Sequence, residues 1–109
     1  SHLRPTSVAG FLRSMPLVFN RHKSKGMDLT YHFDFSGSEP LKATVTIRDK
    51  QVAVSDGLSG KADFMMQADS DAWLSFLRKD KSLPVLLLTR KLRPKGPIAH
   101  LKAFSRCFR

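Results

Sequence analysis

His32 and Asp34 come nearest, by type and spacing, to a catalytic pair in this chain. Residues two apart on a strand project from one face, so an imidazole and a carboxylate would stand together as in a general-base pair. A strand face exposed to solvent carries the same two residues, and we favour that plainer explanation. The other histidines, His2, His22 and His100, are too scattered for metal-ligand spacing. No catalytic residue and no metal site is therefore predicted.

Cys107 is the single cysteine, so the chain cannot form an intramolecular disulfide. This fits a reducing compartment, and we expect a cytoplasmic location. Cys107 has no cysteine neighbour, which favours a buried structural thiol over a nucleophile. Gly57 and Gly60 precede an expected strand, so their loop cannot offer a phosphate the amides of a helix N-terminus. The sequence contains no P-loop and no dinucleotide fingerprint, and we predict a non-enzymatic domain without a cofactor.

Basic residues are concentrated in the final third of the chain. The formal net charge is +10, and residues 78–109 hold ten Lys/Arg against one acidic residue, whereas residues 1–77 hold nine against eight. Such a patch attracts an anionic membrane surface, nucleic acid or an acidic partner protein. A solvated face that aids solubility is the plainer alternative, but the uneven distribution favours an electrostatic role.

Hydrophobic periodicity predicts the elements that carry these residues. Apolar and polar residues alternate from Leu29 to Ser36, from Leu41 to Arg48, around Val52 and Val54, and from Ala62 to Ala68. Short turns join these four segments, which predicts an antiparallel meander. Tyr31, Phe33 and Phe35 share one face of the first strand.

Helical periodicity surrounds this strand region. A helical segment within residues 1–20 is expected to be broken into two pieces by Pro16. Asp69 or Ser70 can cap a helix that ends near Leu77. Pro84 favours a short buried helix over residues 83–88, and Pro94 confines a strand over residues 91–95 to a sheet edge. In a last helix, the residues expected to face inward are Ile98, Leu101, Phe104 and Phe108.

The sequence predicts that the whole chain, residues 1–109, forms one α+β domain. A nucleic-acid-binding module is less favoured, because the helices must cover the aromatic face that would otherwise stack on bases. A partner-docking domain with a closed core stays open. The eight Phe, four Met and clustered leucines are equally consistent with an ordinary core or with a cavity that adapts to a lipid.

Five short segments, taken in order, resemble the sterol carrier protein type-2 domain. They are Phe33–Gly37, Val52–Gly57, Lys61–Met66, Asp69–Leu77 and Lys91–Gly96, and the resemblance covers residues 15–108. It implies a five-stranded, mainly antiparallel sheet, helices over one face, and a hydrophobic tunnel between the layers. It also implies non-catalytic binding of sterols, fatty acids, fatty acyl-CoAs, phospholipids or isoprenoid-like lipids. Such domains also occur as modules of larger enzymes.

The lipid hypothesis assigns two sets of residues. The predicted cavity wall consists of Phe33, Phe35, Val45, Ile47, Met66, Trp73, Phe76, Leu77, Leu86, Leu87, Phe104 and Phe108. The residues predicted to bind anionic head groups or a membrane surface are Arg90, Lys91, Arg93, Lys95, Lys102 and Arg106. The apolar run 83–89 meets the basic run 90–96, and we interpret this junction as the cavity entrance of a domain that can lie peripherally at a membrane.

Overall fold

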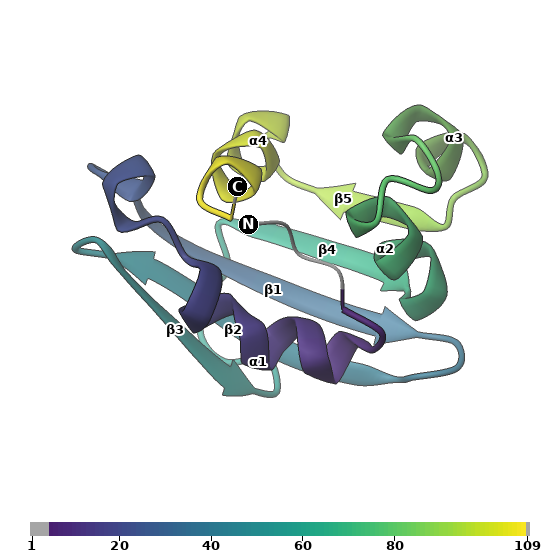
Figure 1. Ribbon diagram of the computed structural model, residues 1–109, viewed down its shortest axis with the longest axis horizontal. Coiled ribbons are helices and arrows are strands. Elements are labelled where there is room, and N and C mark those ends of the chain that lie inside the picture. The colour runs from purple at the N-terminus through teal and green to yellow at the C-terminus, as the bar shows by residue number, and fades with distance from the viewer. Residues whose placement is uncertain (1–4, 109) are drawn as a thin grey trace.

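Five strands form one mixed sheet, and the helices lie over one of its faces (Figure 1). The computed structural model describes residues 5–108. The strands are β1 (Asp28–Ser36), β2 (Leu41–Arg48), β3 (Gln51–Asp56), β4 (Phe64–Asp69) and β5 (Leu92–Lys95), in the spatial order β3-β2-β1-β4-β5. The helices are α1 (Val8–Val18), α2 (Ser70–Leu77), α3 (Leu83–Leu88) and α4 (Ile98–Arg106), with a short 3-10 helix η1 (Arg21–Ser24). The predicted α+β class and mainly antiparallel sheet are confirmed.

The pairing of β4 corrects the predicted antiparallel meander. β4 lies parallel to β1, with Phe64 beside Tyr31 and Met66 beside Phe33. The chain leaves β3 at one edge, crosses the sheet over residues 57–63, and reaches the far side of β1. The Asp63 amide donates to the Thr30 carbonyl oxygen at 2.8 Å, and the Thr30 amide donates to Asp63 Oδ2 at 2.8 Å. These two bonds place the end of the crossing beside β1.

The crossing covers the face of the sheet opposite the helices. His32 and Thr44 lie beneath it and are only 8% and 4% exposed. His32 Nε2 lies 2.9 Å from the Ser59 carbonyl oxygen, and Thr44 Oγ1 donates to the Gly57 carbonyl oxygen at 2.8 Å. The predicted solvated position of His32 is therefore wrong, because a connection between distant strands removes it from water.

The other face of the sheet forms the core. Tyr31, Phe33 and Phe35 point toward the helices, and Phe33 stands opposite Ala43 on β2 and Met66 on β4. All five of these side chains are at most 2% exposed. The alternation of β1 is the reason for this arrangement, since residues two apart share one face.

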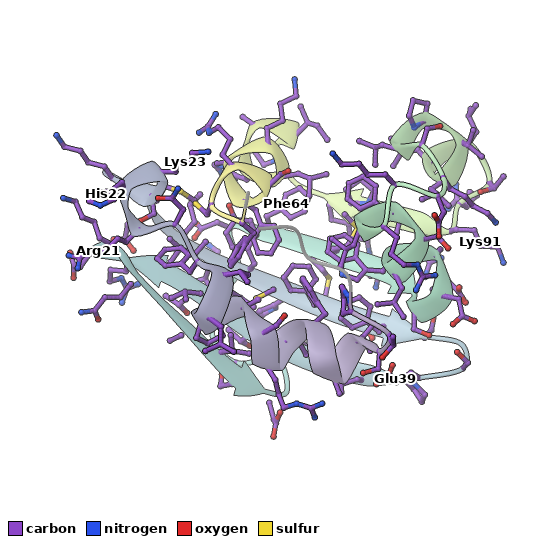
Figure 2. The ribbon with its side chains drawn as sticks, viewed as in Figure 1. Arg21, His22, Lys23, Glu39, Phe64 and Lys91 are labelled. Atoms are coloured by element: carbon purple, nitrogen blue, oxygen red, sulfur yellow. The ribbon has the colours of Figure 1, made fainter. Side chains whose placement is uncertain are left out.

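Two contacts fix the start of α1. The Gly10 amide donates to Ser7 Oγ at 2.9 Å, and the amides of Val8 and Ala9 donate to the Glu39 carboxylate at 2.7 and 3.1 Å. Glu39 belongs to the β1–β2 turn, so this cap ties the helix to the sheet (Figure 2). A carboxylate at a helix N-terminus also interacts favourably with the positive end of the helix dipole, which stabilises the helix.

Pro16 does not divide α1, which corrects the prediction of two pieces. Pro16 removes one helical bond, to the Leu12 carbonyl oxygen, and the helix ends two residues later at Val18, so too little helix follows the proline to form a second piece. The predicted polar loop after the helix contains the 3-10 helix η1. Residues 1–4 of the predicted helical segment 1–20 lie outside the described residues, and so does His2.

In the C-terminal half, the helix cap and the two prolines lie where the sequence predicted them. Asp69 Oδ2 accepts from the Ala72 amide at 3.0 Å and caps α2. Pro84 opens α3, and Pro94 lies on the edge strand β5. Ile98 is 46% exposed, so its predicted inward position is wrong, because it stands at the open start of α4. No helix of residues 5–108 is long and apolar enough to cross a membrane.

Candidate functional site

The residues predicted to form a cavity wall gather in one apolar cluster on the covered face of the sheet. Nine of the twelve are buried, and Phe76, Leu77 and Leu87 are partly buried against them. The rings of Phe33 and Trp73 have centroids 5.5 Å apart, and those of Phe33 and Phe104 are 5.4 Å apart. These rings contact one another in the present conformation, so the predicted tunnel would have to open between them.

Phe11 of α1 belongs to the same cluster but was not among the predicted wall residues. It is fully buried, and its ring centroid lies 5.9 Å from that of Phe33 and 5.5 Å from that of Trp73. The signal was present in the sequence as an apolar stripe of Phe11, Leu12 and Met15. The stripe predicted burial, but which surface it would cover depends on tertiary packing.

An open groove of about 510 Å³ lies at the edge strand β5, and we call it the β5 groove. Its lining combines apolar and basic side chains: Gln67, Leu87, Arg90, Leu92, Arg93, Pro94 and Lys95. Three of the six predicted head-group residues are thus brought together with Leu87 of the predicted wall. The groove lies beside the core, because Leu92 is buried and Pro94 stands opposite the buried Met66.

The end of α3 positions the basic side of this groove. The Lys91 amide donates to the Leu86 carbonyl oxygen at 3.0 Å, and the Arg90 amide donates to the Leu87 carbonyl oxygen at 3.1 Å. This pair of bonds is a Schellman motif, which requires a left-handed residue and usually uses glycine. Arg90 occupies that position at φ 60°. The turn therefore carries a cation where glycine would be less strained.

The other predicted head-group residues lie elsewhere. Lys91 lines a second open groove of about 540 Å³ between α2 and α3, where Asp69, Asp71 and Asp80 also line the surface. Carboxylates at this groove make it less suited to an anionic ligand. Lys102 and Arg106 are exposed on α4, and neither lines the β5 groove. Figure 2 shows Lys91 at the end of the molecule opposite the exposed Arg21, His22 and Lys23.

The residues considered for other chemistry are structural. Cys107 is fully buried, and its Sγ lies 3.3 Å from the Ala103 carbonyl oxygen and 3.5 Å from Met27 Sδ. Burial raises the pKa of the Cys107 thiol above its ordinary value, which keeps it protonated and poorly nucleophilic. Within residues 5–108, no three His, Cys, Asp or Glu side chains gather as a metal site.

The aromatic face proposed for nucleic-acid stacking is covered. Tyr31, Phe33 and Phe35 are at most 2% exposed, and Tyr31 Oη donates to the His100 carbonyl oxygen of α4 at 2.6 Å. Burial raises the pKa of Tyr31 far above its ordinary value. Stacked bases would need these rings at the surface, so this route to nucleic-acid binding is not available in the structure.

Comparison with known families decides the classification. Residues 20–109 match the model of the SCP-2 sterol transfer family. The chain belongs to this family. Membership makes it a domain of a lipid-binding and lipid-transfer family, and it confirms the sterol-carrier-like resemblance of the five sequence segments. Comparison with curated protein sequences gives no match.

Solved structures agree with this SCP-2 fold. The sec-alkylsulfatase Pisa1 from Pseudomonas sp. aligns with a TM-score of 0.79 and 17% identity, covering 90% of this chain and 16% of the sulfatase. A UbiJ-SCP2 ubiquinone synthesis protein aligns at 0.68 and 18% identity, covering 88% and 87% of the two chains. Palmitated SCP2L2 from Aedes aegypti aligns at 0.63 and 12% identity, covering 90% and 89%. This SCP-2 chain therefore spans about a sixth of the sulfatase but most of the length of the other two.

Proposed function

We propose that this SCP-2 domain binds a lipid without catalysis, holding its apolar part among the predicted wall residues and its anionic group at the β5 groove. The candidate ligands are a sterol, fatty acid, fatty acyl-CoA, phospholipid or isoprenoid. The observation that carries the proposal is the lining of the groove, where Leu87, Leu92 and Pro94 adjoin Arg90, Arg93 and Lys95. An amphiphile needs these two kinds of surface side by side.

Entry of the lipid requires part of the helical layer to move, because aromatic rings fill the space above the sheet. We propose that α3 moves. It has six residues, and Leu86 is its one buried side chain among the described residues. Displacing it exposes less apolar surface than displacing α1 or α4. Each methylene of a ligand that becomes buried in the opened space contributes about 0.8 kcal/mol to the binding free energy.

We also propose that α3 contacts an anionic membrane from which the lipid is taken or to which it is delivered. Leu88 is 84% exposed and Val85 is 49% exposed, and the exposed cations Arg90 and Lys91 follow directly. Each Lys or Arg near an anionic leaflet contributes about 1 kcal/mol to binding. In this proposal the domain is cytoplasmic and lies peripherally at the membrane.

The alkylsulfatase likeness supports a further part of the proposal, that this domain serves as an accessory module of a larger enzyme or beside a partner protein. The aligned part is a small fraction of that enzyme, so an SCP-2-like fold is one module within it. The domain would then hold or present a hydrophobic ligand, while chemistry occurs elsewhere.

Native mass spectrometry of the purified domain, followed by organic extraction, tests the central proposal. We expect a co-purifying lipid, or uptake of a fluorescent fatty acid that quenches Trp73. Trp73 is the single tryptophan, so the quenching reports one position in the predicted wall. Failure to retain any lipid together with failure to bind the fatty acid would contradict the proposal. Tight, salt-sensitive binding to oligonucleotides would favour the nucleic-acid alternative.

A further inference from the structure

The indole nitrogen of Trp73 lacks a hydrogen-bond partner. Trp73 is 1% exposed, and within residues 5–108 its Nε1 is the one buried side-chain nitrogen or oxygen left without an acceptor or donor. Buried donors are nearly always paired, because an unpaired one destabilises the folded state. An orphaned donor in an otherwise satisfied structure therefore needs an explanation.

The surroundings of Trp73 supply no acceptor of ordinary strength. Its ring lies 5.5 Å from the ring centroids of Phe11, Phe33 and Phe76, and 6.1 Å from that of Phe35. The face of an aromatic ring is a much weaker acceptor than an oxygen atom. In an ordinary closed core, a phenylalanine would fill much of this volume without the unpaired donor.

The position of the donor connects it to the proposed function. Phe33, Phe35 and Phe76, which surround Trp73, are three of the residues predicted to enclose the apolar part of a lipid. The β5 groove, which receives the anionic group in that proposal, is lined by other residues. The free N–H is thus available to a second polar atom, one carried within the buried part of the ligand.

We propose that Trp73 is a specificity-determining residue whose Nε1–H selects lipids with an oxygen acceptor, a carbonyl, ether or hydroxyl, in their buried part. This inference rests on the proposed lipid binding and deepens it. A plain hydrocarbon chain leaves the indole unpaired, whereas a chain with an oxygen at the matching position satisfies it. The preference therefore depends on where the oxygen stands along the chain, and not on the polarity of the ligand as a whole.

A series of fatty acids tests this inference. The probes are stearate and oxostearates with the ketone at successive positions, since all carry the same carboxylate and a ketone only accepts. Dissociation constants are measured by displacement of a fluorescent fatty acid from the wild type and from Trp73→Phe. At one ketone position we expect about threefold to tenfold tighter binding than stearate, the gain typical of one net hydrogen bond. In Trp73→Phe this advantage should disappear, so that the oxostearate and stearate have similar dissociation constants whatever the affinity of the variant for stearate.

A measurement on the wild type alone guards against loss of folding in the variant. The single tryptophan gives one indole N–H signal in a ¹⁵N-correlated NMR spectrum. This proton should move downfield with the preferred oxostearate and not with stearate. The inference is overturned if stearate binds as tightly as every oxostearate, or if the ketone advantage survives in Trp73→Phe. Those results leave the proposed function standing, whereas absence of binding by stearate and all oxostearates overturns both.

Discussion

Arg93 Nη1 donates a hydrogen bond to the carbonyl oxygen of Arg90 at 2.9 Å. The bond joins the turn after α3 to the edge strand β5 and sets two cations on the same groove. Neither residue forms an ion pair among the described residues. Both guanidinium groups therefore keep their charge available for an anionic ligand.

Replacing Arg90 by glycine should stabilise the fold and weaken the binding of an anionic ligand. Arg90 has φ 60°, a conformation that strains a side chain but not glycine. We expect Arg90→Gly to raise the free energy of unfolding by about 0.5–1 kcal/mol, since the relief of strain exceeds the added freedom of the unfolded chain. Binding of an anionic fatty acid should weaken at the same time. Urea unfolding and a fluorescence titration measure the two effects.

Lys79→Gly is the matched control for this change. Lys79 has φ 63° and ends α2 with the same pair of bonds, from Lys79 to Phe76 and from Asp80 to Ser75. Its replacement should stabilise the fold similarly and leave fatty-acid binding unchanged, because Lys79 does not line the β5 groove. Equal loss of binding in both variants would show that the groove is not the anionic site.

Removing the other two groove cations should weaken binding more. Arg93→Gln combined with Lys95→Gln takes two charges from the β5 groove. At about 0.2–1 kcal/mol for each exposed ion pair, the dissociation constant of a monomeric fatty acid should rise by roughly twofold to thirtyfold. The paired control, Lys102→Gln with Arg106→Gln, removes two exposed charges from α4 and should have little effect. A larger effect from the α4 pair would place the anionic group at α4 instead.

Leu88 should contribute to membrane contact. Leu88→Ser removes an apolar side chain that is 84% exposed beside the basic run. Binding to phosphatidylcholine vesicles that contain phosphatidylserine should weaken by roughly fivefold or more, since burying a leucine contributes about 1.5–3 kcal/mol. Leu17 of α1 is 85% exposed, so Leu17→Ser is a control of equal chemistry and exposure. Vesicle flotation distinguishes the two, and a loss confined to Leu17→Ser would assign the contact to α1.

The fold should lose stability in alkaline solution partly through Tyr31. Burial raises the pKa of Tyr31 above its ordinary value of 10.0, so the folded state holds this proton more tightly than the unfolded chain. The resulting stability is fully present below about pH 10 and is lost as the pH rises toward the folded pKa. Tyr31→Phe should flatten the fall in unfolding free energy above pH 10. Denaturant unfolding across pH 8 to 11 measures this, and parallel curves for the two proteins would contradict it.

Local sequence signals predicted most of the elements of this fold. Alternation in Leu29–Ser36 predicted β1 and its apolar face, and Pro84 and Pro94 predicted α3 and an edge strand. These signals act between residues close in the chain, where one proline or a period of two limits the backbone directly. Pro16 was misjudged, because the effect of a proline depends on how much helix follows it.

Long-range relationships were decided by the tertiary structure. The crossing over residues 57–63 makes β4 parallel to β1 and buries His32, and nothing local in the sequence distinguishes it from a hairpin turn. Packing likewise left Trp73 Nε1 without an acceptor, and it placed Arg93 but not Lys102 in the lining of the β5 groove. The sequence could thus indicate that an apolar segment meets a basic segment after Leu88. Which cations share a groove depends on contacts between residues far apart in the chain, which only the folded chain brings together.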